Sequence, residues 1–288
     1  MCQLLGMNCN TAATIGFSFT GFAERGGRTA DHKDGWGVAF YEGQGSRVFH
    51  DDQPASDSAL ADFLRRYPFK SRIVIAHIRK ATQGDVSLAN CHPFQREWLG
   101  QTWFFATNGD LQQFQPALDG SYLPVGSTDS ERAFCFMMQS LRARFSGRRH
   151  APDWLELAPA VAEISAGIAA HGNFNFLLSN GQALFAHCSS QLHALQRQHP
   201  FPTARLVDYD LSLDLGALNH RDDRMALIAT EPLTADEHWL AFRTGELKVF
   251  VDGTQAWSAV NEATRCFPVA STSGVGRGVR APAAFGNT

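Results

Sequence analysis

Met1-Cys2-Gln3-Leu4-Leu5-Gly6-Met7 opens the chain, and the interpretation of every later segment depends on this stretch. It lacks the basic segment and long apolar run of a secretory signal, so we expect a natural N-terminus at Met-Cys. Removal of Met1 would leave Cys2 with a thiol and a free α-amine, a base with a pKa near ~8. Because cysteine is more often a small packing residue, the other segments must decide between packing and chemistry.

The composition argues against several classes of function. The 288 residues are 44% hydrophobic and include 22 Phe, enough for a large core. A net charge of −3 without a block of Lys or Arg argues against a nucleic-acid partner. No apolar run reaches the ~18 residues of a membrane span. The six cysteines form no Cys-x-x-Cys pair, and the missing secretory signal predicts that they are reduced thiols in the cytoplasm. No Cys/His spacing typical of a metal site occurs, and no cofactor is expected.

The order of predicted elements is strands, a helix, strands, two helices and strands again. An apolar face predicts the first helix, over residues 56–66. Thr128 and Glu131 form a predicted capping box at the start of the second, over 128–145, and the third covers 153–170. Predicted strands cover 2–7, 38–41, 47–50, 73–76, 103–106, 173–178, 183–185, 225–229 and 247–251.

Turn residues complete this outline. Asn180-Gly181 predicts a tight hairpin, and Asp252-Gly253 predicts a second reversal. The glycine-rich end of the chain lacks apolar periodicity and is expected to be disordered. We therefore expect one domain over residues 2–265, built from two packed sheets with helices outside, and a flexible tail over 266–288.

Three polar stretches follow predicted strands or precede a helix, where strands can hold loops rigidly. His77-Ile78-Arg79 offers a guanidinium that could clamp a carboxylate or form an ordinary surface salt bridge. Asn108-Gly109 offers two N–H donors for one oxygen, or a plain turn. Ser127-Thr128-Asp129-Ser130-Glu131 offers a carboxylate for an ammonium group, or helix capping alone.

Together these motifs resemble a known family. The motifs that carry the resemblance, in chain order, are Met1-Cys2, Ala76-His77-Ile78-Arg79-Lys80-Ala81-Thr82, Asn90-Cys91-His92-Pro93, Asn108-Gly109 and Ser127-Thr128-Asp129-Ser130-Glu131. Their order and spacing, over roughly residues 2–260, resemble the class II glutamine amidotransferase domain of the N-terminal-nucleophile hydrolases. Arg25-Gly26-Gly27, Asp34-Gly35-Trp36-Gly37 and Ala229-Thr230-Glu231-Pro232-Leu233-Thr234 make the chain most similar to its stand-alone, YafJ-type bacterial members.

The resemblance implies a fold and a set of roles. The fold would be an α+β, four-layer αββα sandwich. Cys2 would attack the side-chain amide of glutamine, with its own α-amine as base, and form a glutamyl thioester. Asn108 and Gly109 would hold the oxyanion. Substrate binding would involve Arg79 at the α-carboxylate and Asp129 at the α-amine, with Thr82 and His92 lining the pocket. His77 and Trp36 are as well explained by packing as by a role in the site.

The family's larger members pass ammonia to a synthase domain in the same chain, whereas we expect only the flexible tail to follow the sandwich here. The acceptor would be a separate synthase, or the enzyme would hydrolyse a γ-glutamyl amide without any acceptor. Two further alternatives are a cysteine-dependent acylase for other amides and a non-catalytic amino-acid-binding partner subunit.

Overall fold

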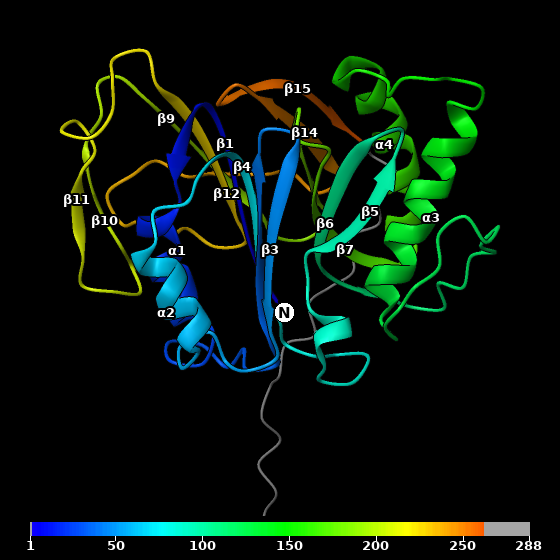
Figure 1. Ribbon diagram of the computed structural model, residues 1–288, viewed down its shortest axis with the longest axis horizontal. Coiled ribbons are helices and arrows are strands. Elements are labelled where there is room, and N and C mark those ends of the chain that lie inside the picture. Colours follow the sequence, from blue (N-terminus) through cyan, green and yellow to red (C-terminus); the bar gives the residue numbers. More distant parts are fainter. Residues whose placement is uncertain (1, 262–288) are drawn as a thin grey trace, which may run out of the picture.

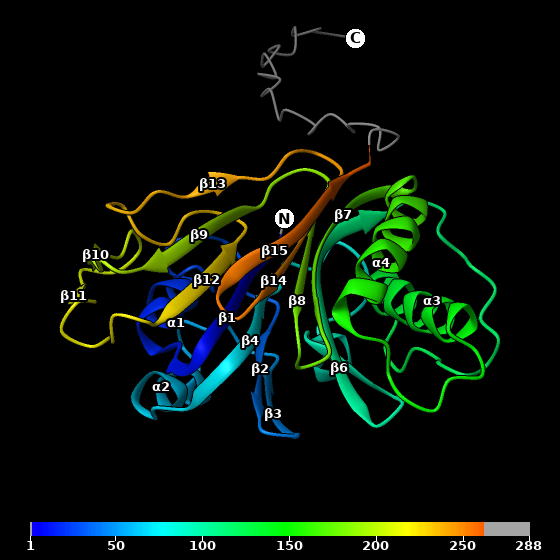
Figure 2. The ribbon, with the colours of Figure 1, turned by 90° about the horizontal axis from the view of Figure 1, so that it is seen from above.

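Two β-sheets lie face to face in the computed structural model, which describes residues 2–261, and helices cover both outer faces (Figure 1, Figure 2). The tail predicted over 266–288 lies outside the described residues. The strand pairings within residues 2–261 are all antiparallel.

The first sheet has seven strands, in the order β13-β9-β12-β1-β4-β2-β3. Their bounds are β1 (Gln3–Thr14), β2 (Trp36–Glu42), β3 (Gly45–Asp51), β4 (Lys70–Ile78), β9 (His193–Gln198), β12 (Arg224–Ala229) and β13 (Leu240–Ala241). The opening stretch of the sequence forms the centre of this sheet, because β1 pairs with β4 on one side and β12 on the other. Gln3 pairs with Ile78, so β1 begins beside the end of β4.

The second sheet has six strands, in the order β15-β14-β8-β7-β6-β5. Their bounds are β5 (Phe94–Trp98), β6 (Gln101–Leu111), β7 (Gly172–Ser179), β8 (Leu184–Cys188), β14 (Glu246–Val251) and β15 (Thr254–Val260). A separate small ribbon pairs β10 (Thr203–Arg205) with β11 (Ser212–Asp214).

Two helices cover each sheet (Figure 2). Helices α1 (Gly16–Glu24) and α2 (Ala59–Arg66) pack on the seven-stranded sheet, and α3 (Asp129–Arg144) and α4 (Trp154–Ala169) pack on the six-stranded sheet. Between the sheets lies a third apolar cluster that includes Leu4, Ile75, Phe104 and Leu177. The predicted αββα sandwich is thereby confirmed.

Half of the predicted capping box forms at α3. The Thr128 hydroxyl accepts a hydrogen bond from the Glu131 N–H at 3.2 Å. The Glu131 carboxylate, however, accepts from the N–H groups of Val125 and Gly126 and pairs with Arg96 at 2.6 Å. The segment before the helix, rather than its own N-cap, therefore uses this carboxylate.

Some predictions were wrong in detail. The strand predicted to end before Asn108-Gly109 continues to Leu111, because β7 pairs with it as far as Leu111–Gly172. The hairpin at Asn180-Gly181 exists, but Ser179 pairs with Leu184, which leaves a loop of residues 180–183 instead of a two-residue turn. Helix α1 and strands β5, β9, β10, β11 and β13 were not predicted, because they are short or have no clear apolar period.

Candidate active site

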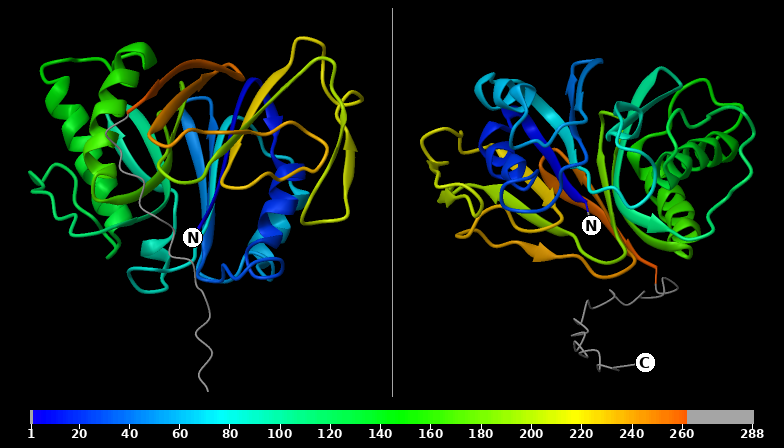
Figure 3. Two further views of the ribbon diagram at one scale, coloured as in Figure 1. Left: turned by 180° about the vertical axis from the view of Figure 1, so that it is seen from behind. Right: turned by 90° about the horizontal axis from the view of Figure 1, so that it is seen from below.

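Side-chain alternation brings the predicted residues of β1, β4 and β6 onto one face. Leu4, Ile75 and Phe104 face the space between the sheets. Since side chains alternate along a strand, the same register directs His77 and Asn108 into that space. Cys2 directly precedes β1 and Arg79 directly follows β4, and both continue the same alternation. The start of β1 lies between the two halves of the molecule when it is seen from below (Figure 3).

Hydrogen bonds show that these residues share one end of the sandwich. At the opposite end, the Tyr41 hydroxyl lies 2.9 Å from the Thr102 carbonyl oxygen, near the start of β6. At the near end, the Gln83 amide donates to the Asp110 carboxylate at 2.6 Å and joins the loop after β4 to the end of β6. The sheets are therefore aligned so that β4 and β6 end together, beside the beginning of β1.

Cys2 is half-buried and its thiol lies against the backbone of the segment after β4. The sulfur is 3.3 Å from both the N–H and the carbonyl oxygen of Lys80. Burial raises the pKa of the Cys2 thiol, although the Lys80 N–H and the charge of Arg79 act in the opposite direction. A neutral thiol in this position needs a base before it can act as a nucleophile.

Arg79 is a buried cation without a carboxylate partner among residues 2–261. Its guanidinium donates to the backbone carbonyls of Gln83, Gly84 and Asp85 at 3.0, 3.2 and 3.0 Å. Buried arginines elsewhere are paired, such as Arg197 with Glu237 at 2.6 Å. Burial of a charge without a counter-ion is costly, so Arg79 is suited to receive an anionic ligand.

Asn108 carries an amide donor that has no hydrogen-bond partner. The residue is 2% exposed, and its Nδ2 makes no hydrogen bond within the described part of the chain. A buried donor left unpaired costs about 1–3 kcal/mol. An oxygen atom of a bound ligand would satisfy this donor.

Gly109 lies in the part of β6 that has no neighbouring strand on one side. Strand β5 pairs only with Gln101–Phe105, so its ladder ends four residues before Gly109. On the other side, a Cβ atom at this position would lie 2.4 Å from the Asn173 carbonyl oxygen, which excludes any residue larger than glycine. The segment is therefore held close to β7 and open along its other edge.

Asp129 reaches that same open edge of β6. Its carboxylate accepts hydrogen bonds from the N–H groups of Leu111 and Ser130, both at 2.8 Å. Burial raises the pKa of this half-buried carboxyl group, while the two N–H donors lower it. Successive backbone N–H groups point to opposite edges of a strand, so the N–H groups of Gly109 and Leu111 share one edge of β6. The carboxylate bound to Leu111 therefore lies one two-residue repeat, roughly 7 Å, beyond the Gly109 N–H.

The positions of the other predicted residues do not by themselves indicate a role in the site. His92 is 3% exposed and its ring centre is 4.2 Å from that of His77. Burial lowers the pKa of His77 to about 3 and that of His92 well below its usual range, so both imidazoles are neutral. Thr82 is exposed in the loop after β4. Trp36 packs against Phe19 in the outer core, with ring centres 5.7 Å apart.

Asn90 connects the two predicted substrate-binding positions, a role that the sequence did not reveal. Its Nδ2 donates to the Asp85 carbonyl, which also holds Arg79, and its Oδ1 accepts from the Ser127 N–H. Asn90 therefore joins the loop around Arg79 to the segment that leads into Asp129. The signal was its place in the Asn90-Cys91-His92-Pro93 motif, for which only His92 received a role.

Arg25 and Thr230 hold the first residues of β1. The Thr230 hydroxyl accepts from the Leu4 N–H at 2.9 Å. Arg25 is 4% exposed, pairs with Asp208 at 2.7 Å and donates to the Pro232 carbonyl at 2.6 Å and the Gln3 side chain at 3.3 Å. Two motifs that are distant in the sequence thus contact each other next to Cys2.

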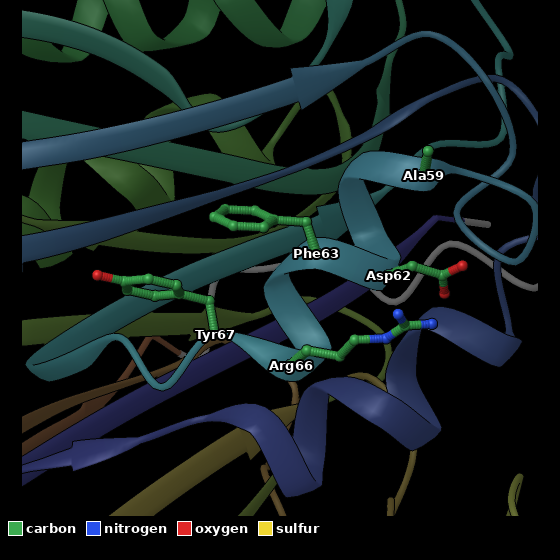
Figure 4. A pocket seen from close by; sticks show the side chains of 5 residues that line it. All are labelled: Ala59, Asp62, Phe63, Arg66 and Tyr67. Atoms are coloured by element: carbon green, nitrogen blue, oxygen red, sulfur yellow. The ribbon is translucent and has the colours of Figure 1, made fainter.

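Outside this site, residues 2–261 show no metal cluster and no membrane helix, but they line other surface depressions. No group of three or more His, Cys, Asp or Glu side chains suited to a metal occurs in residues 2–261. No helix in the same range is long and apolar enough to cross a membrane. A surface depression at α2 is lined by Ala59, Asp62, Phe63, Arg66 and Tyr67, all from one helix and its C-cap (Figure 4). It lies on the outer face of the seven-stranded sheet and brings no distant residues together.

Comparison with known proteins identifies the family of this chain. The family model for class II glutamine amidotransferases matches residues 1–273. A Haemophilus influenzae protein named as a glutamine amidotransferase is 47% identical over 253 residues, which cover 88% of this chain and 85% of that protein. YafJ of Escherichia coli is 43% identical over 253 residues, with 88% and 98% coverage.

Solved structures show the same likeness. The crystal structure of a predicted glutamine amidotransferase from Pseudomonas aeruginosa has a TM-score of 0.70 and 40% identity, and covers 89% of this chain and all of that one. Glutamine phosphoribosylpyrophosphate amidotransferase of Bacillus subtilis has a TM-score of 0.55 at 14% identity, with 90% and 49% coverage, and so shares the fold. The chain belongs to the class II glutamine amidotransferases.

Proposed function

We propose that the chain is an N-terminal-cysteine amidohydrolase that releases ammonia or an amine from glutamine or a γ-glutamyl amide. The observation that carries this proposal is the unpartnered, buried Nδ2 of Asn108, at the end of the sandwich where Cys2 and Arg79 also lie. Cleavage of an amide in an α-amino acid requires a nucleophile, a hydrogen-bond donor for the oxyanion and a cation for the carboxylate. The thiol, the free amide donor and the arginine can supply them.

The mechanism begins with Met1 removed and the α-amine of Cys2 free. The amine takes the thiol proton, directly or through a water molecule, and the sulfur attacks the side-chain amide carbon. The resulting oxyanion accepts hydrogen bonds from Asn108 Nδ2 and the Gly109 N–H, which replace water in stabilising the negative charge. The C–N bond then breaks, and the leaving nitrogen takes the proton from the amine, which yields ammonia and a glutamyl thioester.

Hydrolysis of the thioester completes the cycle. The amine now takes a proton from water, and the hydroxide attacks the thioester carbon within the same oxyanion hole. Breakage of the C–S bond releases glutamate and returns the proton to sulfur. The sum is glutamine plus water to glutamate plus ammonia, so no redox partner or cofactor is required.

Substrate orientation would come from two opposite charges. The Arg79 guanidinium would bind the α-carboxylate, exchanging part of its carbonyl contacts for a charged partner. The Asp129 carboxylate would bind the α-ammonium group while its other contacts hold it at the edge of β6. Thr82 and His92 are proposed as pocket residues through the family resemblance alone.

The fate of the ammonia is a separate part of the proposal. A separate synthase would take up the ammonia, or the enzyme would act as a γ-glutamyl hydrolase and release its products. Both require the same recognition of the glutamyl group. A non-catalytic partner subunit would instead bind glutamine without producing ammonia.

The test is ammonia and glutamate release from glutamine, followed by a panel of γ-glutamyl amides, with the purified chain. Intact mass must first show loss of Met1. We expect activity that requires Cys2, and a Cys2→Ala variant that still binds glutamate. Activity that survives Cys2→Ala would overturn the proposal, and ligand binding without hydrolysis by the wild type would support the binding-subunit alternative.

A further inference from the structure

Asn175, in β7, is bonded to the carbonyl group of Asn108. We propose that Asn175 is a positioning residue that fixes the Asn108–Gly109 peptide, so that the Gly109 N–H points into the oxyanion hole. The inference rests on the proposed function and adds a residue that none of the sequence motifs contains.

Asn175 is fully buried and uses both ends of its side chain. Nδ2 donates to the Asn108 carbonyl at 2.9 Å and to the Ser190 hydroxyl at 2.9 Å. Oδ1 accepts from the N–H groups of Ser189, Ser190 and Gln191 at 2.9, 3.0 and 3.3 Å. The side chain therefore ties the turn after β8 to the part of β6 that carries the site.

The orientation of this amide follows from its partners. Backbone N–H groups can only donate, so the atom that faces three of them must be the oxygen. Rotation of the amide by 180° would place Nδ2 against three donors and Oδ1 against the Asn108 carbonyl oxygen. The nitrogen must therefore face Asn108, and the bond to its carbonyl is fixed by chemistry.

The direction of the Gly109 N–H follows from this bond. The carbonyl of Asn108 and the N–H of Gly109 belong to one planar, trans peptide, so they point in opposite directions. Asn175 lies in β7 directly opposite Asn108, so its side chain holds the Asn108 carbonyl toward β7. The Gly109 N–H must then point to the other edge of β6, which β5 leaves uncovered and where Asp129 binds Leu111.

A fixed peptide matters because glycine resists rotation less than other residues. A rotated peptide would direct a carbonyl oxygen at the developing oxyanion and withdraw one of its two donors. The hydrogen bond to the carbonyl also polarises the peptide and strengthens its N–H as a donor. Asn175 thus acts on the transition state through Gly109 and has no need to touch the substrate.

Asn175→Asp is the sharpest variant, since it removes the donor while the carboxylate oxygen still accepts from the turn at residues 189–191. We expect kcat for glutamine hydrolysis to fall about 10- to 100-fold, with KM changed less than about twofold. A γ-aldehyde analogue of glutamine, which forms a hemithioacetal with Cys2, should bind more weakly by a similar factor. Glutamate, which needs only the binding residues, should bind as it does to the wild type.

Two matched controls separate positioning from general structure. Thr107→Val removes the hydroxyl that donates to the Asn175 carbonyl at 2.7 Å, and Ser190→Ala removes the second acceptor of Nδ2. Both leave the bond to Asn108 in place, so we expect both to keep kcat within about twofold. A loss in either control equal to that in Asn175→Asp would overturn the positioning role.

The outcomes distinguish the inference from the proposed function. Unchanged kcat and aldehyde binding in a folded Asn175→Asp variant would overturn the inference, as would an equal loss of glutamate binding. A wild-type chain that neither hydrolyses glutamine nor binds the aldehyde would overturn the proposed function, and the inference with it. If the variant does not fold, hydrogen exchange of the wild-type Asn175 side-chain amide decides. Strong protection is expected, and free exchange would contradict the inference.

Discussion

The middle and one end of the space between the sheets are built from the same strands but differ in chemistry. In the middle, β1, β4 and β6 contribute Leu4, Ile75 and Phe104, which pack into a closed apolar cluster. At the end, β6 contributes Asn108, while Cys2 and Arg79 stand one residue beyond β1 and β4. This end therefore carries a thiol, a cation without a carboxylate partner and an unpartnered amide. The middle is an apolar core without polar groups to pair, whereas the end has an amide and a cation that a bound ligand would pair.

The contrast shows that the candidate site is the end of the core at which buried polar groups lack partners. A folded protein normally pairs its buried polar groups, and Arg25, Arg96 and Arg197 are each paired with a carboxylate. At the site, Arg79 has no carboxylate partner and the Asn108 amide has no hydrogen-bond partner. This lack of pairing is an energetic cost that a function can explain. Substitutions at the end should therefore change activity more than stability, and substitutions in equivalent buried positions elsewhere should do the reverse.

The largest effect is expected for Cys2→Ala, which removes the proposed nucleophile. We expect glutamine hydrolysis to fall by at least about 10⁴-fold, with the thermal midpoint nearly unchanged because the residue is half-buried. Cys9→Ala is the matched control, because Cys9 lies in β1, which Cys2 directly precedes, and is 2% exposed in the outer core. The Cys9→Ala variant should be less stable but keep its activity. An equal loss of activity in Cys2→Ala and Cys9→Ala would contradict the assignment of Cys2 as the nucleophile.

Asn108→Ala should have the next largest effect. Loss of one oxyanion donor lowers kcat by about 10²- to 10³-fold with little change in KM, because the donor acts in the transition state. Removal of an unpartnered buried donor should also leave stability unharmed. Asn180→Ala, a buried asparagine in the loop at the far end of β7, should lower stability without a change in kcat. Steady-state kinetics and thermal unfolding of both variants provide the measurement.

Arg79 and Arg96 give a smaller but sharper contrast. Arg79→Met should raise KM for glutamine about 10- to 100-fold, since a charged hydrogen-bond pair contributes about 1.5–3 kcal/mol. Arg96→Met should leave KM unchanged but lower the free energy of unfolding by about 3 kcal/mol, because Glu131 would stay buried without its cation. A higher KM in Arg96→Met than in Arg79→Met would contradict the assignment of Arg79.

The smallest expected effect is a change in the pH dependence of stability. Burial lowers the pKa of His77 to about 3, so between about pH 6.5 and 3 the unfolded chain binds a proton that the folded chain does not. The free energy of unfolding therefore falls as pH falls, by about 1.4 kcal/mol per pH unit for this group. His77→Leu should reduce the slope measured by urea unfolding between pH 6 and 4.5. His150→Leu, at an exposed position, is the matched control.

Local patterns were sufficient for part of the fold. The amphipathic face of residues 56–66 and the Thr128 cap led to α2 and α3 within a few residues of their bounds. The buried run 73–76 identified β4. By contrast, Asn108-Gly109 looked like the end of a strand, because the residues that extend the ladder, Gly172–Asn175, come more than sixty positions later.

The site could be predicted only where a motif marked it. Cys2, Arg79, Asn108 and Asp129 stand in recognisable stretches, and alternation then placed three of them on one face. Asn175 and Asn90 act through bonds between segments that are distant in the chain, so neither their spacing nor their residue type distinguishes them from ordinary polar residues. Such contacts become visible only when the strands are in register.

Labelling with a diazoketone analogue of glutamine tests the central claim most directly, because it requires a pocket for the glutamyl group and a reactive thiol at the same place. The purified chain would be incubated with the reagent, and its intact and peptide masses measured with and without excess glutamine. We predict one label per chain, on Cys2 of molecules that have lost Met1, and protection by glutamine. Label on a different cysteine, or equal labelling of chains that retain Met1, would contradict the account.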